Sequence, residues 1–386
     1  MQEPMRKVTT SKVLHIVAGD LAVVVGLCVV AEVVLRLVAP QPLQYMLRHV
    51  YEAVEGGGYR FKPGASTSCN NGFGEHAFSV NRWGARDKDY GPKRPGEWRI
   101  LCVGDSFSEN QALEVEQIYP NVLEADLQRA YAKKCFSVIN AGMAGWGLWQ
   151  YHDFLVEMLD EINPDVVVVA LNVVGDAVRT IDRPRERPFD IRAGLPVHAQ
   201  ASWPQRLHWM VWYVNQLLEE RSHAYVAFRR LTYYPCQWLG VGPSSRLSEL
   251  CTVAARAEKV RGPTIEIIQR IKAVCDRHGV AFVLLSVPRQ YEVVHAASQF
   301  RIQMERLDVS TVDFERPRRL MQAIASAVGT PLCDPTDDLA ASESPTYFSG
   351  FAHWNAHGNQ IVALALRRVL EHEGLLGFRT AFTASP

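Results

Sequence analysis

Residues 166–171 are the segment that most constrains the fold, because all six residues are apolar (VVVVAL). A short apolar run without alternation predicts a strand covered on both faces, as in the middle of a parallel sheet. Residues 148–162 before it carry apolar side chains at helical spacing, and Asn163, Pro164 and Asp165 end that helix. A helix that leads into a buried strand is typical of a βαβ unit with a right-handed crossover.

Residues 100–103 predict a second buried strand, and the turn after that strand carries a serine. Gly104 and Asp105 bend the chain, and Ser106 lies where the next helix or loop begins. In α/β proteins the reacting groups lie at the carboxyl ends of parallel strands, and backbone N–H groups after such a turn can bind an oxyanion. Glycine, aspartate and serine are also ordinary turn residues, so this segment alone fits a nucleophile and a plain helix cap equally well.

The alternation of strands and helices continues along the chain. Further strands are predicted at 136–140, 281–287 and 331–333, and helices at 120–134, 264–278, 317–328 and 355–373. This order predicts an α/β fold with a parallel sheet.

Residues 181–262 interrupt the alternation. Residues 183–188 are rich in proline and charge, and aromatic residues then gather at 203–231 and 233–243. This pattern fits a helical insertion that covers the core, and it also fits an exposed aromatic lid or docking face, since Trp and Tyr are favoured interface anchors. We favour core cover.

Near the amino terminus, residues 21–38 form an apolar run of 18 residues, about 27 Å long as a helix and close to the thickness of a hydrocarbon core. No small-residue cleavage site follows Pro40, so an uncleaved single-span anchor is favoured over a cleaved signal peptide. Basic residues before the run predict a cytoplasmic amino terminus, an inner-membrane anchor and a periplasmic main domain. Glu32 is expected to pair with Arg36 on the helix surface rather than with a partner inside the membrane.

Composition excludes several classes of function. Lys plus Arg and Asp plus Glu both number 41, so the net charge is zero and nucleic acid is not an expected partner. The 8 cysteines contain no CxxC pair, which argues against a metal ribbon or a thioredoxin-like site, and neither a metal nor a cofactor is expected. Four of them are expected to pack in the core: Cys102, Cys135, Cys275 and Cys333. Free thiols are favoured over a disulfide for three others: Cys69, Cys236 and Cys251.

Three short motifs occur in the order found in SGNH/GDSL hydrolases. They are GDSF at 104–107, NAGMAGWG at 140–147 and HWNAHGN at 353–359. The chain best resembles the membrane-anchored bacterial branch of this superfamily, in which a segment like residues 78–107 leads into the serine. The resemblance covers residues 70–375, with a poorly matched middle. It implies a flavodoxin-like three-layer α/β/α sandwich.

The resemblance also implies a role for individual residues. Ser106 would be the nucleophile and His353 the general base, while the N–H groups of Ser106 and Gly145 would bind the oxyanion together with an asparagine. His357 is the weaker candidate for the base, because it lies one turn into the last predicted helix.

The expected asparagine is the first departure from the family pattern. The family usually has an Asn-Asp pair shortly after the third strand, whereas this chain has Gly175 followed by Asp176. Asn172 could complete the oxyanion hole if the loop is rebuilt. Loss of one such donor typically lowers the rate by about 10²–10³-fold.

The acid that orients the histidine is the second departure. In the family it precedes the histidine by two or three residues, but here those positions hold Gly350 and Phe351. Asp176 and Asp334 are the candidate replacements. A Ser–His dyad could also act weakly alone, because each member of a triad contributes only part of the rate enhancement.

These patterns divide the chain into five segments: a cytoplasmic tail and transmembrane anchor (1–40), an irregular collar (41–98), the first part of the core (99–180), the aromatic helical insertion (181–262) and the second part of the core (263–386).

The favoured function is a membrane-anchored esterase, O-acyl hydrolase or acyltransferase. The alternative is a catalytically inactive relative that serves as an accessory subunit of a membrane complex through its transmembrane helix and its insertion. An SGNH-like carbohydrate-binding module differs from that alternative only in its ligand.

Overall fold

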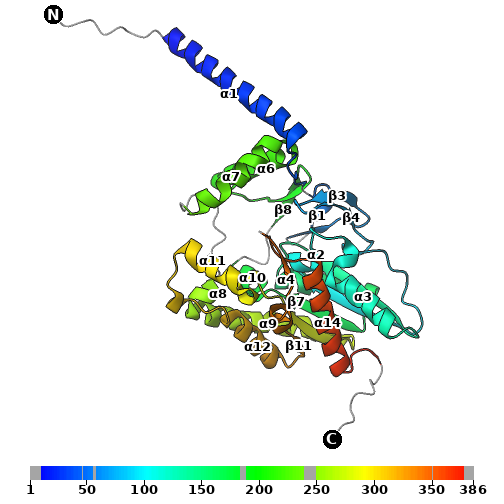
Figure 1. The fold of residues 1–386 in the computed structure, drawn as a ribbon. Helices are drawn as coiled ribbons and strands as arrows, with labels where there is room; N and C mark the ends of the chain where they lie inside the picture. Colours follow the sequence, from blue (N-terminus) through cyan, green and yellow to red (C-terminus); the bar gives the residue numbers. More distant parts are fainter. Residues whose placement is uncertain are drawn as a thin grey trace, which may run out of the picture. The chain divides into compact units, whose positions relative to one another are not determined.

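The computed structural model describes residues 10–45, 47–54, 58–182, 188–238, 249–349 and 351–377 (Figure 1). The chain divides into two compact units. Unit 1 comprises Met1–Met46, Asn70–Gly74 and Trp203–Ser244, and unit 2 comprises Leu47–Cys69, Glu75–Ser202 and Ser245–Pro386. Unit 2 contains the predicted sheet.

The centre of unit 2 is a parallel sheet with the strand order β11-β10-β7-β5-β6. Its strands are β5 (Glu97–Gly104), β6 (Cys135–Gly142), β7 (Val166–Leu171), β10 (Ala281–Ser286) and β11 (Leu332–Cys333). Numbered along the chain, this is the 2-1-3-4-5 order of flavodoxin-like folds. All positions of β7 are buried, as its apolar sequence predicts. The predicted fold class is therefore confirmed.

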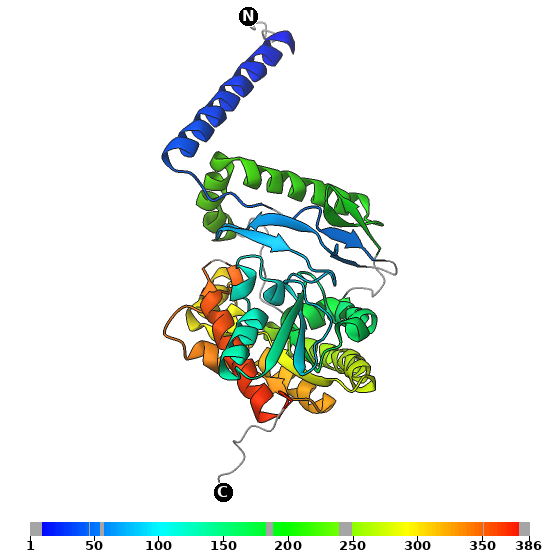
Figure 2. The same cartoon turned by 90° about the vertical axis from the view of Figure 1, so that its right-hand side faces the viewer.

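Helices cover both faces of the sheet, because successive residues of each strand point to opposite sides. One face packs against α3 (Tyr119–Ala130) and α14 (Ala356–His372). The other packs against α4 (Leu148–Ile162), α9 (Ala254–Arg277) and α12 (Arg316–Val328), as Figure 2 shows from the side. Shorter helices connect these elements: α2 (Ser106–Glu109), η1 (Val115–Gln117), η2 (Val173–Ala177), α5 (Val178–Asp182), α8 (Glu249–Thr252), α10 (Gln290–Val293), α11 (His295–Glu305), η3 (Val309–Thr311) and α13 (Thr336–Ala340).

One predicted helix start is wrong in an informative way. The helix predicted from residue 264 begins at Ala254 and passes through Pro263, whereas proline normally suits the first turn of a helix. The last helix has the predicted bounds within one residue at each end, and His353 precedes it on β13 (Phe351–Trp354), which pairs with β12 (Tyr347–Phe348). Asn355 then caps α14, because its side chain accepts a hydrogen bond from the N–H of Gly358 (2.9 Å).

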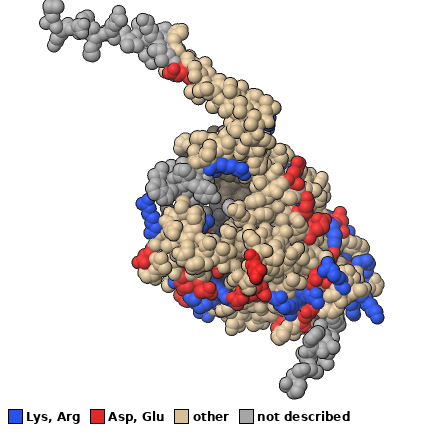
Figure 3. Space-filling model, viewed as in Figure 1, with Lys and Arg blue, Asp and Glu red and all other residues tan. Residues whose placement is uncertain are grey.

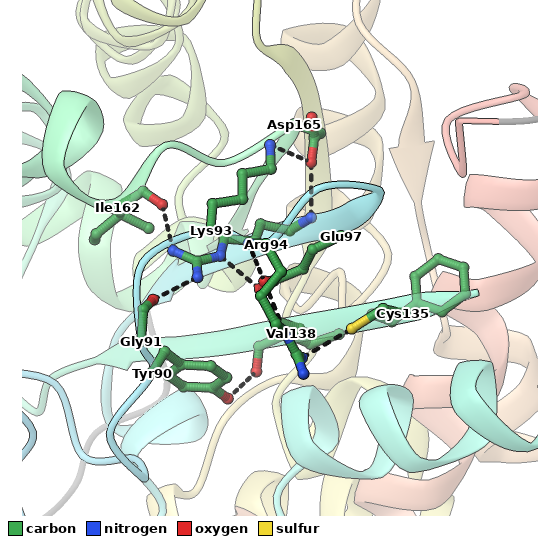
Figure 4. Close-up of polar contacts among 12 residues, drawn as sticks. Tyr90, Gly91, Lys93, Arg94, Glu97, Cys135, Val138, Ile162 and Asp165 are labelled. Carbon is green, nitrogen blue, oxygen red and sulfur yellow. Dashed lines mark hydrogen bonds and ion pairs between the residues drawn. The ribbon is translucent and has the colours of Figure 1, made fainter.

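A buried polar network joins the amino ends of the strands, at the edge of the sheet opposite their carboxyl ends (Figure 4). The guanidinium of Arg99 donates to the carbonyl oxygens of Gly91 (2.6 Å) and Ile162 (3.0 Å) and to the carboxylate of Glu97 (2.7 Å). Glu97 also accepts a hydrogen bond from the hydroxyl of Ser137 (2.7 Å). Burial raises the pKa of the Glu97 carboxyl, but these donors outweigh burial and lower it to about 2.

The collar of unit 2 and the start of the insertion consist of short antiparallel pairs. These are β1 (Tyr51–Ala53) with β2 (Tyr59–Phe61), β3 (Ser66–Asn70) with β4 (Glu75–Ser79), and β8 (Phe189–Arg192) with β9 (Leu195–His198). The cysteines whose side chains are described are all free thiols, including the buried Cys69 and Cys251. The side chain of Cys236 and most of the linker at 183–188 lie outside the described residues.

Unit 1 is built around α1 (Thr10–Val38). Its segment Val17–Val38 has a mean hydropathy of 2.6 and contains no buried residue, and it is long and apolar enough to cross a membrane. Figure 3 shows that charged side chains are sparse along this helix. The predicted Glu32–Arg36 pair is present (2.6 Å).

Two further helices of unit 1, α6 (Trp203–Arg221) and α7 (His223–Trp238), lie in the aromatic insertion. The carboxylate of Glu32 accepts hydrogen bonds from the hydroxyl of Ser222 (2.7 Å) and the N–H of Ala224 (2.9 Å), and so caps α7. The preference for core cover is wrong for α6. Its apolar residues recur every three or four positions and are exposed, among them Trp203 (74%), Met210 (56%) and Val214 (52%).

Candidate active site

The turn after β5 has room only for glycine at two positions. Gly104 and Gly142 pair at the carboxyl ends of β5 and β6, and α2 lies directly above them. A Cβ atom at Gly104 would lie 2.3 Å from Oγ of Ser108, and one at Gly142 would lie 2.3 Å from its Cβ. The missing side chains therefore let α2, which begins with Ser106, lie against the ends of the strands.

Asp105 and Ser106 begin this short helix. The carboxylate of Asp105 accepts a hydrogen bond from the N–H of Phe107 (2.9 Å) and so acts as its N-cap. Ser106 is the first residue of α2, so its N–H points away from the helix and has no helical acceptor. Its side chain is half-buried and lies at the carboxyl edge of the parallel sheet.

Ser106 and His353 form a hydrogen bond, with Oγ and Nε2 2.8 Å apart. The imidazole packs on the ring of Phe107, with the centroids 4.5 Å apart. The strand that carries His353 is held by the carbonyl oxygen of Trp354, which accepts hydrogen bonds from Asn110 (2.9 Å) and Asn359 (3.2 Å). Contacts with α2 and α14 thus fix the histidine beside the serine.

His357 occupies a different place. It lies at the exposed start of α14, and its Nε2 is 3.0 Å from Oγ of Ser342. The chain therefore contains a second Ser–His hydrogen bond, away from the turn after β5, that serves as a matched control for the first.

A buried arginine from the segment before β5 stabilises the backbone that follows Ser106. Arg86 donates hydrogen bonds to the carbonyl oxygens of Glu109 (2.6 Å), Asn110 (2.7 Å) and Leu113 (2.7 Å), which follow Ser106. These acceptors lie at the carboxyl end of α2, where a cation is electrostatically favoured. The segment at 78–107 thus has a physical role in placing the serine.

The environment of His353 keeps its imidazole neutral at pH 7. Burial is the largest cause and lowers the pKa of His353 to about 4. The negative charge of Asp105 raises this pKa, and the positive charge of Arg289 lowers it. A neutral imidazole can accept the hydroxyl proton of Ser106.

This low pKa predicts the acid limb of the pH–rate profile. Since His353 must be neutral to act as a base, kcat/KM for an uncharged ester is expected to be flat from about pH 5 to 8 and to fall as the pH decreases through about 4. Rates would be measured with intrinsic fluorescence recorded in the same buffers, so that unfolding is separated from protonation. An acid limb near the ordinary value of 6.5 would contradict the lowering of the His353 pKa by its surroundings.

The predicted oxyanion residues have different surroundings. Gly145 has a φ of +84° and is exposed, three residues after the end of β6. Asn172 is fully buried, donates to the carboxylate of Asp105 (3.4 Å) and accepts from the N–H of Gly175 (3.1 Å). Its carboxamide therefore braces the turn after β7 against Asp105.

The two candidate orienting acids are engaged elsewhere. The fully buried Asp176 accepts hydrogen bonds from the hydroxyl of Tyr151 (2.9 Å) and the N–H of Asn172 (3.0 Å). Burial raises the pKa of its carboxyl. Asp334 is 2.8 Å from the guanidinium of Arg318. Asp105 is thus the carboxylate whose charge acts most strongly on His353.

Sequence reasoning missed Asp105 and Arg289 as members of the site. The sequence pattern indicates Asp105 only as a residue of the turn and does not single out Arg289. Both follow parallel strands at their carboxyl ends, after β5 and β10, and this position was the available signal. Among the described side chains, no group of three or more His, Cys, Asp or Glu is placed to hold a metal ion.

Comparisons with known proteins found solved structures that are distant from this chain in sequence. No family model matches the chain, and no curated protein matches it. Similar solved structures include TesA, with 14% identity and a TM-score of 0.39 over 72% of this chain and 99% of TesA. The acetyl xylan esterase AlAXEase has 14% identity and a TM-score of 0.37 over 70% of this chain and 99% of its own. A GDSL-like lipase from Bacteroides thetaiotaomicron has 12% identity and a TM-score of 0.37 over 74% of this chain and 93% of the lipase. The strand order and register of the sheet itself establish the flavodoxin-like fold.

Proposed function

We propose that the protein is a serine ester hydrolase of the SGNH type. The observation that carries this proposal is the 2.8 Å hydrogen bond between Ser106 and His353 at the carboxyl edge of the sheet. In that position Nε2 of the neutral imidazole takes the hydroxyl proton while Oγ attacks the acyl carbonyl. The imidazolium then gives this proton to the departing alcohol, and a water molecule activated by the same nitrogen releases the carboxylic acid and regenerates Ser106.

Two features of the site support this cycle in place of a complete triad. The N–H of Ser106 is available at the start of α2, and we propose the N–H of the exposed Gly145 as the second donor to the oxyanion. The carboxylate of Asp105 raises the pKa of His353 and therefore favours the imidazolium that forms during the reaction. We propose O-acyl esters as the substrate class, with acetylated envelope glycans as the first group to examine, and transfer to an alcohol as the related reaction.

Replacing the nucleophile tests the proposal. The full chain in detergent micelles is expected to hydrolyse p-nitrophenyl acetate, and Ser106→Ala is expected to reduce kcat/KM to the level of buffer alone. Ser342→Ala is the matched control, because it removes the other serine that contacts a histidine, and its activity is expected to stay within about twofold. Full activity in Ser106→Ala, or none in the wild type, would contradict the hydrolase and favour the accessory-subunit alternative.

We further propose that α1 anchors the protein in the inner membrane as a single span, with unit 2 in the periplasm. The support is the length and exposed apolar surface of Val17–Val38. Because Glu32 of this helix caps α7, the exposed apolar side of α6 is proposed to rest on the bilayer surface. A carboxyl-terminal alkaline phosphatase fusion is expected to be active and a green fluorescent protein fusion dark. The reverse result would place unit 2 in the cytoplasm.

A further inference from the structure

Arg289 is a half-buried cation without an anionic partner among the described residues. It follows β10, and its Nε is buried without a hydrogen bond. The neighbouring carboxylate of Glu292 instead accepts the backbone N–H of Arg289 (3.0 Å), and burial raises the pKa of Glu292 to about 8. Glu292 is therefore mostly uncharged at pH 7, and the guanidinium keeps donors that nothing in the described chain uses.

The guanidinium lies beside the residues that surround the Ser–His pair. Its central carbon lies 5.6 Å from the centre of the Phe107 ring, and this ring packs on His353. Its Nη2 lies 2.9 Å from the position that a Cβ atom would take at Gly175. The arginine thus occupies the space that a side chain at residue 175 would fill.

We propose that Arg289 binds the oxyanion of the tetrahedral intermediate. Attack by Ser106 places a full negative charge on the former carbonyl oxygen, and the backbone N–H groups of Ser106 and Gly145 supply at most two donors. The guanidinium adds a charged donor on the side left open by Gly175, where hydrogen bonds to charge are strongest. This inference rests on the proposed hydrolase function and adds to it the residue that carries the developing charge.

Removing the guanidinium tests the inference. Arg289→Met is expected to lower kcat by about 10²–10³-fold with little change in KM, because the interaction exists only in the transition state. The loss is expected to be equal for p-nitrophenyl acetate and for the anionic mono-4-nitrophenyl succinate. An unchanged kcat would overturn the inference. An effect confined to the KM of the anionic ester would also overturn it, and would show that Arg289 binds the negative charge of the substrate instead.

A second-site variant provides a sharper readout. The backbone of Gly175 lies outside the left-handed region, so an asparagine there is compatible with its conformation, but its Cβ would collide with Arg289. Gly175→Asn combined with Arg289→Met is therefore expected to recover at least about tenfold of the lost kcat, since a neutral donor replaces the charged one. A folded double variant, as judged by its Tm, that remains as slow as Arg289→Met would contradict the inference.

These experiments distinguish a failure of the role inferred for Arg289 from a failure of the proposed hydrolase function. If Ser106→Ala is inactive while Arg289→Met keeps the wild-type kcat, only the role of Arg289 fails. If Ser106→Ala remains active, the proposed hydrolase fails and the role of Arg289 fails with it. A shift of the acid limb to higher pH in Arg289→Met is an added readout, because the arginine lowers the pKa of His353.

Discussion

Replacing His353 with alanine is expected to lower kcat for ester hydrolysis by about 10⁴-fold or more, because the nucleophile and its base act as one unit. Without the imidazole, the hydroxyl of Ser106 keeps its proton at pH 7 and attacks the acyl carbonyl poorly. The side chain lies 2.8 Å from Oγ of Ser106, so its loss leaves no other described group in the same place. Steady-state kinetics of the full chain measure the effect.

His357→Ala is the matched control for this prediction. His357 is four residues further along the chain, is exposed and contacts Ser342 instead of Ser106. Its replacement is expected to change kcat by less than about twofold, as for most surface substitutions. Equal losses in the two variants would show that hydrolysis does not depend on the geometry around Ser106.

Arg99→Ala is expected to reduce the free energy of unfolding of unit 2 by about 3–5 kcal/mol, because it leaves the carboxylate of Glu97 buried without its cation. The same substitution removes hydrogen bonds to the carbonyl oxygens of Gly91 and Ile162. The corresponding decrease in Tm, roughly 5–10 °C, can be measured by thermal unfolding in detergent. A decrease of less than about 2 °C would contradict the structural role of this network.

Arg94→Ala is the control at the same carboxylate. The side chain of Arg94 is 68% exposed and 3.4 Å from Glu97, so its loss is expected to cost no more than about 1 kcal/mol.

Acid adds a second readout. The pKa of Glu97 is lowered from 4.5 to about 2 in the folded chain, so its contribution to stability, about 3 kcal/mol, is present above pH 4.5 and lost as the pH falls toward 2. This acid dependence is expected to shrink in Arg99→Ala and to persist in Arg94→Ala.

The elements with strong local signals could be predicted to the residue. Val166–Leu171 and Leu148–Ile162 have the predicted bounds, because one is wholly apolar and the other ends at Asn163, which adopts a left-handed conformation. The exposed side of α6 could not be distinguished from a core-facing side, since periodicity reports an apolar face and not what covers it.

The site could be predicted only in part. The motif order placed Ser106 and His353 together, whereas their hydrogen bond depends on contacts between α2, β13 and α14 that no local pattern encodes. The short distance between Arg289 and Gly175 also depends on contacts that no local pattern encodes. β7 and β10 are neighbours in the sheet, and the loops after them meet although they are far apart in sequence. A search for polar residues in the loops that follow parallel strands would have identified Arg289.

Covalent labelling of the full chain with a fluorophosphonate, followed by peptide mass spectrometry, is the most direct test of the central claim that Ser106 is a nucleophile activated by His353. We expect one adduct, on the peptide that contains Ser106, which forms far more slowly in His353→Ala and at the wild-type rate in His357→Ala. An adduct on another serine with Ser106 unmodified, or no adduct on the folded wild-type protein, would contradict it.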